Sequence, residues 1–143
     1  MPVSSDQDIA RILSGAHRVA LLGASHKPER ASHRVMRFLQ AQGCEVIPVN
    51  PGLAGQTLLG CEVVAELADI TAPVDMVDVF RNAHFLPAIV SEVIAARAPV
   101  MWTQLDVVDH AAAETAEAAG VEVVMDRCPA IEWPRLRRLG LLD

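Results

Sequence analysis

Residues 18–32 read RVALLGASHKPERAS, and they contain three kinds of local structure in succession. The apolar run 19–22 predicts a buried strand, Gly23 predicts a tight turn, and Ser32 is expected to cap a helix that begins at about His33. At such a junction a glycine lets the backbone approach a ligand closely, and the free N–H groups and dipole of the helix favour negative charge. A strand, a glycine turn and a helix start in this order therefore predict an anion site.

The charge around this stretch is opposite to the charge of the whole chain. Lys27, the only lysine, lies with Arg30, Arg34 and Arg37 in a segment that contains one acid, Glu29, whereas the formal net charge of the chain is −6. These cations also fit a solvated loop. Because the local excess of positive charge opposes the global sign, we favour contact with a phosphate-bearing ligand.

Strands and helices are expected to alternate along the rest of the chain. Apolar runs predict strands at about 18–22, 45–50, 74–80, 99–105 and 121–125, and helical periodicity predicts helices at about 4–16, 32–42, 85–97 and 109–119. Glycines at 43 and 120 fit helix ends. This order predicts an α/β fold, a doubly wound parallel sheet of about five strands with helices on both faces. We expect residues 1–143 to form a single domain with its core at about 18–132.

Three finer expectations concern particular strands and the C-terminal tail. Pro48 predicts that part of the second strand lacks a ladder partner. Asp75 and Asp78 suggest that the third strand is less buried than the first. The tail from residue 126 is assigned no helix, and its arginines are expected to form an exposed basic face: Arg135, Arg137 and Arg138.

Composition excludes several classes of protein. No apolar run is long enough to span a bilayer, and the first ten residues lack the basic start and apolar block of a signal peptide, so a cytoplasmic protein without membrane contact is expected. Three cysteines without a CxxC pair argue against a disulfide framework, and five histidines lack metal-ligand spacing. The acidic balance and an aromatic content of 3% argue against nucleic-acid binding.

The carboxyl ends of the predicted strands nominate the binding site, because ligands of parallel α/β sheets bind at that edge. A nicotinamide dinucleotide is the first ligand to test. Its GxGxxG fingerprint would need glycines at 23, 25 and 28, where the chain has Gly23, Ser25 and Pro28. The second strand ends in Asn50-Pro51 instead of the acid that binds a ribose diol. NAD is therefore disfavoured, although an NAD(P)-linked or other nucleotide-dependent enzyme stays as the alternative.

No residue pattern predicts catalysis. Ser25 lies outside a G-x-S-x-G elbow, and His26 fits a loop residue better than a general base. Asp75 and Asp78 are three apart on a strand and do not face the same way. Cys128 follows Arg127, which would favour a reactive thiolate, but a structural cysteine is the preferred interpretation. We therefore predict a binding protein and not an enzyme.

Five blocks, in order, together resemble one known family. They are Gly23-Ala24-Ser25, Val49-Asn50-Pro51, 77–81 (VDVFR), 102–105 (WTQL) and 124–129 (VMDRCP). The chain is similar to the small stand-alone CoA-binding proteins, and through them to the N-terminal domain of the succinyl-CoA ligase alpha subunit. The resemblance runs from about Arg18 to Glu132.

This resemblance implies a Rossmann-like domain that binds coenzyme A. It places the turn 23–25 (Gly23, Ala24, Ser25) and Lys27 against the phosphates, and Asn50-Pro51 along the nucleotide end. Residues implied along the adenosine and pantetheine arm are Phe80, Arg81, Trp102, Thr103 and Gln104. Two further residues are expected at the site from the sequence pattern itself. Cys128 follows the last predicted strand, and Ser32 lies at the predicted helix start of the anion site.

The chain also departs from the ligase pattern. Its first turn has less glycine, and Gly52-Leu53 stands where a basic residue often follows the Asn-Pro turn. The 3′-phosphate is then expected either to contact Arg30 or Arg34 or to be held loosely. The second ligase domain, with its phosphohistidine, has no counterpart, and no catalytic residue is carried over. The expected ligand is CoA or an acyl-CoA. A regulatory subunit that senses acyl-CoA and docks a protein partner is a further alternative.

Overall fold

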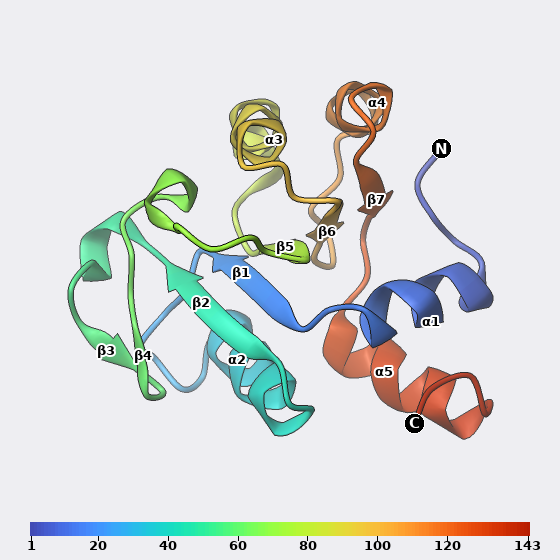
Figure 1. Ribbon diagram of the computed structural model, residues 1–143, viewed down its shortest axis with the longest axis horizontal. Coiled ribbons are helices and arrows are strands. Elements are labelled where there is room, and N and C mark those ends of the chain that lie inside the picture. Colours follow the sequence, from blue (N-terminus) through green and yellow to red (C-terminus); the bar gives the residue numbers. More distant parts are fainter.

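The computed structural model describes residues 1–143 and contains one central sheet of five parallel strands. The strands lie side by side in the order β2-β1-β5-β6-β7 (Figure 1). Their bounds are Arg18–Leu22 (β1), Glu45–Val49 (β2), Met76–Val79 (β5), Val100–Thr103 (β6) and Glu122–Val124 (β7). The predicted Rossmann-like, doubly wound α/β sheet is confirmed, and each predicted strand is present.

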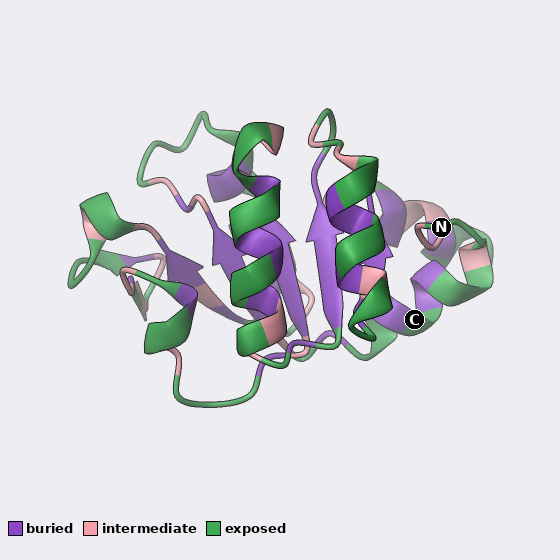
Figure 2. Ribbon diagram, turned by 90° about the horizontal axis from the view of Figure 1, so that it is seen from above, coloured by how far each residue is buried: buried purple, intermediate pink, exposed green.

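Helices cover both faces of the sheet. Figure 1 shows α3 and α4 on one side, and α1, α2 and α5 on the other. Their bounds are Asp6–Ser14 (α1), Ala31–Ala41 (α2), Leu86–Ala95 (α3), His110–Ala118 (α4) and Pro129–Arg138 (α5). Seen from above, the strands are buried, and α3 and α4 present exposed outer surfaces (Figure 2). None of the helices combines the length and hydropathy that a bilayer span requires.

The connection from β2 to β5 contains no α-helix. It holds a two-stranded antiparallel hairpin, β3 (Thr57–Leu58) and β4 (Cys61–Glu62), between two 3₁₀ turns, η1 (Pro51–Leu53) and η2 (Leu67–Asp69). A third 3₁₀ turn, η3 (Ala83–Phe85), leads into α3. Pro48 predicted a strand that lacks a ladder partner along part of its length. It lies in β2, which is an edge strand of the main sheet.

The strand order creates a crevice between β1 and β5. From β1 the chain moves outward to β2, then crosses back to β5 on the other side of β1. The connections that leave β1 and β5 therefore diverge, and such a switch point is where open α/β sheets bind ligands. This crevice lies at the carboxyl edge that the sequence nominated.

The third predicted strand, β5, is more buried than expected. All four of its residues are buried, and Asp78 has 0% exposed surface. β5 is the middle strand of the sheet, flanked by β1 and β6, with helices on both faces. Two aspartates suggested a partly exposed strand, but the place of β5 in the strand order decides its burial.

The tail after residue 126 is also different from the prediction, because Pro129–Arg138 forms α5. Pro129 occupies the first helical turn, where proline needs no N–H, but Pro134 lies inside the helix and hid the pattern. Arg135 is not part of a free basic face: its guanidinium pairs with Asp6 of α1 at 2.8 Å and with Glu132 at 3.1 Å. Arg137 and Arg138 are exposed as expected.

Candidate functional site

Three adjoining pockets lie along the carboxyl edge of the sheet. The α2 pocket, of about 450 Å³, lies at the start of α2. The α3 pocket, of about 350 Å³, lies between the end of β2 and α3 and shares Gly23, Asn50 and Gly52 with it. The α5 pocket, of about 690 Å³, lies at the ends of β5 and β6 against the start of α5, and it shares Ala31 and Phe80 with the α2 pocket.

The turn after β1 brings two strand ends into direct contact. Gly23 has φ +87°, and a Cβ atom added there would lie 2.9 Å from the carbonyl oxygen of Phe80. The N–H groups of Gly23 and Ala24 both donate to the carbonyl oxygen of Val49. The left-handed conformation and the close approach both require glycine, so Gly23 fixes the shape of the floor of the α2 pocket.

Asn50 holds the neighbouring turn against this one. Its Nδ2 donates to the carbonyl oxygen of Ala24 at 2.7 Å, and its Oδ1 accepts the N–H of Gly52 at 2.8 Å. Ser25 has a similar local role, since its Oγ accepts the N–H of Lys27. Asn50 therefore acts as a positioning residue, with both ends of its amide engaged by backbone.

The start of α2 supplies unpaired donors to the same pocket. The helix begins at Ala31 with Arg30 at its N-cap, and no side chain caps it. Ser32 was expected at the cap, but it lies inside the first turn and is buried. The backbone N–H groups of Ala31 and Ser32 make no hydrogen bond within the protein. Free N–H groups at a helix start, together with the helix dipole, form an anion site.

The charged side chains of the α2 pocket are all basic. Lys27 and Arg30 are exposed and form no ion pair, and no aspartate or glutamate lines the pocket. In the chain as a whole acids outnumber Lys and Arg, 18 to 12. The α2 pocket therefore concentrates two cations and a helix start where an anionic group would be held.

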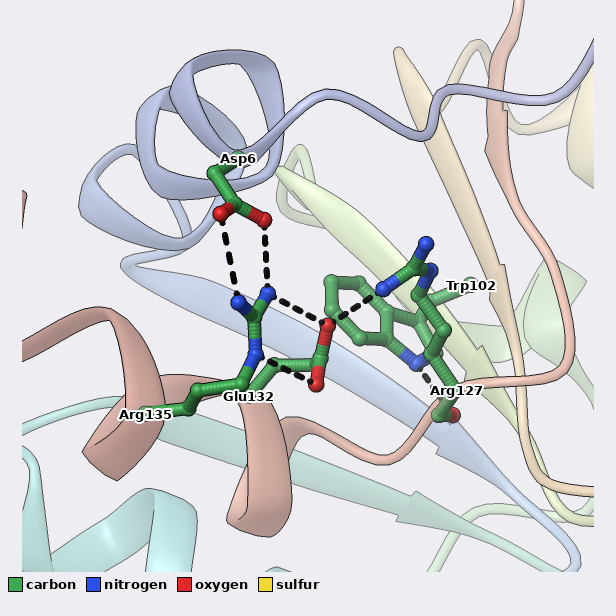
Figure 3. Close-up of polar contacts among 5 residues, drawn as sticks. All are labelled: Asp6, Trp102, Arg127, Glu132 and Arg135. Atoms are coloured by element: carbon green, nitrogen blue, oxygen red, sulfur yellow. Dashed lines mark hydrogen bonds and ion pairs between the residues drawn. The ribbon is translucent and has the colours of Figure 1, made fainter. Parts of the chain in front are cut away.

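A polar network fixes the turn between β7 and α5 (Figure 3). Cys128, Ala130 and Ile131, at and after this turn, line the α5 pocket. The buried Trp102 donates its indole N–H to the carbonyl oxygen of Arg127 at 2.7 Å. The Arg127 guanidinium pairs with Glu132 at 2.6 Å, and Glu132 also accepts from Arg135, which reaches Asp6. Burial opposes ionisation of Glu132, but hydrogen bonds from Arg135 and Arg127 outweigh it and lower its pKa.

Most of the predicted site residues meet at these pockets. Eight of them line the α2 pocket, namely Gly23, Ala24, Ser25, Lys27, Arg30, Ser32, Asn50 and Phe80. Pro51 lines the α3 pocket, Gln104 and Cys128 line the α5 pocket, and Arg81 lines both of these.

Two predicted residues are placed differently. Trp102 and Thr103 have 0% exposed surface and line none of the three pockets. They precede the carboxyl edge on β6, and the side chains that reach the pocket follow them, at Gln104 and Leu105. Trp102 and Thr103 support the site from inside the core, so direct contact with a ligand does not fit them.

Cys128 is 8% exposed, and the Arg127 guanidinium, which in the alternative interpretation would favour its thiolate, is engaged by Glu132. The structure adds Leu105 and Ile131 to the edge of the α5 pocket, which sequence reasoning did not nominate. Ile131 belongs to the helix that the sequence did not predict. Leu105 ends the block 102–105 of the family resemblance, but it was not among the residues implied at the ligand. No group of three His, Cys, Asp or Glu side chains could hold a metal ion.

Residues 17–134 match the family described as CoA binding domain. The chain belongs to the CoA-binding domain family. It is 38% identical over 124 residues to YneT of Bacillus subtilis, a match that covers 87% of this chain and 90% of YneT. The matched residues include all three pockets, so the family region and the carboxyl-edge site coincide.

Two solved structures resemble this CoA-binding domain along nearly its whole length. The protein cell-free ID.343 from Thermus thermophilus is 41% identical with a TM-score of 0.89, over 93% of this chain and 99% of that one. A hypothetical protein from Pyrococcus horikoshii is 34% identical with a TM-score of 0.89, over 96% of both chains. The fold and the small size of the domain are therefore shared with these relatives.

Proposed function

We propose that the chain binds coenzyme A or its thioesters along the carboxyl edge of the sheet and has no catalytic activity of its own. The observation that carries the proposal is the α2 pocket: an uncapped helix start, Lys27 and Arg30 without ion-pair partners, and no lining carboxylate. Such a pocket fits the phosphate groups of CoA. Membership of the CoA-binding domain family supports this ligand over other phosphate compounds.

The order of the three pockets also supports CoA. A phosphate group held in the central α2 pocket would leave the α3 pocket for one end of the molecule and the α5 pocket for the other. We assign the nucleoside end to the α3 pocket, where Asn50 and Pro51 lie, and the pantetheine arm to the α5 pocket, where Gln104 lies. CoA has phosphate groups between a nucleoside at one end and a pantetheine arm at the other, so its three parts match the three pockets in order.

NAD is the ligand that this proposal must exclude. At the end of β2, where the ribose-binding acid of a dinucleotide site stands, the chain has Asn50, whose amide is engaged by Ala24 and Gly52. The two carboxylates of the α3 pocket, Glu66 and Glu92, come from other segments. Titration calorimetry at moderate salt with CoA, acetyl-CoA, NAD and NADP tests the assignment. We expect CoA and acetyl-CoA to bind more tightly than either dinucleotide. Equal or tighter binding of NAD would overturn the proposal.

Lys27→Ala tests the location of the phosphates. Removal of a charge-assisted hydrogen bond costs about 1–3 kcal/mol, so CoA should bind about five- to 150-fold more weakly. Because Lys27 is exposed, the free energy of unfolding should barely change. Arg138→Ala is the matched control, since it removes one exposed positive charge from the far end of α5. Equal loss of affinity for CoA in both variants would show that Lys27 contributes only to the net charge of the protein and does not contact the phosphates.

A further inference from the structure

The α5 pocket differs in chemistry from the α2 pocket beside it. Nine of its fourteen lining residues are hydrophobic, against four of twelve in the α2 pocket. Its volume of about 690 Å³ lies within the roughly 300–1,000 Å³ that is typical of small-molecule sites. Because Ala31 and Phe80 line both pockets, one ligand can extend from the charged pocket into the apolar one.

Two exposed apolar side chains flank the α5 pocket. Leu105, which follows β6, has 51% of its surface exposed, and Ile131 of α5 has 54%. Exposed apolar side chains that line one pocket form a surface on which an apolar group can be buried. An apolar group of a ligand would remove both from water.

Gln104 gives the same pocket a buried polar group without a partner. The residue is 6% exposed, its Oε1 is inaccessible to water, and neither end of its amide makes a hydrogen bond within the protein. A buried acceptor without a donor is destabilising. The Nε2 of Gln104 makes no hydrogen bond within the protein and is not among the fully buried atoms, so a ligand carbonyl would accept from it. The pantetheine arm and the thioester of an acyl-CoA both contain carbonyl groups.

We propose that the α5 pocket holds the acyl group of a CoA thioester, together with the thiol end of the pantetheine arm, and that it prefers an aliphatic acyl chain. This inference rests on the proposed function, because the phosphates of the same ligand would occupy the α2 pocket. A chain that ends in a carboxylate fits less well, because nine of the fourteen lining residues are hydrophobic and burial of a carboxylate among them costs its hydration. The charged residues of the pocket carry both signs, Asp106 against Arg34 and Arg81, and the Arg81 guanidinium lies 4.2 Å from the centroid of the Phe85 ring.

The test is a calorimetric series with CoA, acetyl-CoA, hexanoyl-CoA and succinyl-CoA. Each methylene group that becomes buried strengthens binding by about fourfold. Hexanoyl-CoA should therefore bind at least about tenfold more tightly than acetyl-CoA, even if only part of the chain is covered. Succinyl-CoA should show no advantage over acetyl-CoA. Equal affinity for acetyl-CoA and hexanoyl-CoA, or a preference for succinyl-CoA, would overturn the acyl assignment.

A paired variant locates the effect. In Leu105→Ser/Ile131→Ser the ratio of hexanoyl-CoA to acetyl-CoA affinity should fall by about tenfold, because both apolar walls are lost. Leu139→Ser is the matched control, since Leu139 is 57% exposed at the C-terminal end of α5 and lines none of the three pockets. It should leave the ratio unchanged. An unchanged ratio in the double variant would refute the location.

The series separates the two proposals. If CoA binds but the acyl chain makes no difference, only the acyl assignment fails. If neither CoA nor any thioester binds, the proposed function fails, and the acyl assignment fails with it.

Discussion

Replacement of Asp78 by leucine should make this protein more stable, and increasingly so as the pH rises. Asp78 lies in the middle of β5, in register with Leu21 of β1 and Trp102 of β6, and it has 0% exposed surface. Neither carboxyl oxygen has a hydrogen-bond partner. Burial raises the pKa of Asp78 well above its ordinary value of 3.8. Leucine has the same number of side-chain heavy atoms and the same branching, so it removes the polar atoms while its larger methyl groups fill the site more tightly.

The expected gain has two parts. Removal of a buried, unsatisfied polar group stabilises the folded state by about 1–3 kcal/mol at any pH. The second part follows from the raised pKa of Asp78. Above pH 3.8 the unfolded chain loses this proton while the folded protein keeps it, so the wild-type free energy of unfolding falls as the pH rises. The fall is about 1.4 kcal/mol per pH unit until the folded-state pKa is reached.

Urea unfolding of wild type, Asp78→Leu and Asp78→Asn at pH 4, 5, 6 and 7 measures both parts. Asp78→Leu should exceed wild type at pH 4, and the gap should widen toward pH 7. Asp78→Asn keeps a buried polar group but cannot ionise. It should therefore abolish the part of the pH dependence of the free energy of unfolding that Asp78 causes, without the gain from removing a polar group. Asp75→Leu is the opposing control, because Asp75 accepts the N–H groups of His17 and Arg18, and its loss should destabilise. A gap that stays constant with pH would refute the reasoning.

Three further predictions concern the site and its supports. Gly23→Ala should lower the free energy of unfolding by about 1–3 kcal/mol and weaken CoA binding, because it combines φ +87° with a Cβ atom 2.9 Å from the Phe80 carbonyl; unchanged melting and binding would contradict this. Glu132→Gln should cost about 1–3 kcal/mol at pH 7, measured by urea unfolding. Pairing lowers the pKa of Glu132 below 4.5, so its contribution to the free energy of unfolding is present above that pH and is lost as the pH falls. The stability difference between wild type and Glu132→Gln should therefore shrink in acid, and a difference that stays constant would refute the pairing. Finally, incubation with CoA disulfide should form a Cys128–CoA mixed disulfide with release of one CoA thiol, because Cys128 lines the α5 pocket. Peptide mass spectrometry locates the adduct. An adduct at Cys61, or none, would show that Cys128 has only a packing role.

The sequence was sufficient for the features that depend on local order. Gly23 between an apolar run and a helix predicts the strand, the turn and the helix start, since each depends on residues within a few positions. The alternation of strands and helices predicts the parallel sheet, and the sheet places the strand ends at one edge. The residues of the α2 pocket follow from these two steps.

Features that depend on distant partners were not predictable in this way. Arg135 read as part of a basic surface, because nothing near it shows that Asp6, 129 residues away in sequence, lies against it. Trp102 was placed at the site because it ends a strand, yet the covering α5 that buries it contains Pro134 and was not predicted. The burial of Asp78 depends on the order of the strands, which its own sequence neighbours do not determine.

The contact between the first and last helices has a consequence for synthesis on the ribosome. Ile9 and Leu13 of α1 are buried, and the carboxylate of Asp6 is held by Arg135 near the C-terminus. α1 leaves the ribosome before the five strands of the sheet, whereas its packing partner α5 follows all of them. The apolar face of α1 must therefore stay exposed to water until α5 has been translated. Loss of the last fifteen residues through premature termination would leave that face uncovered in the released protein, and quality-control proteases recognise such surfaces.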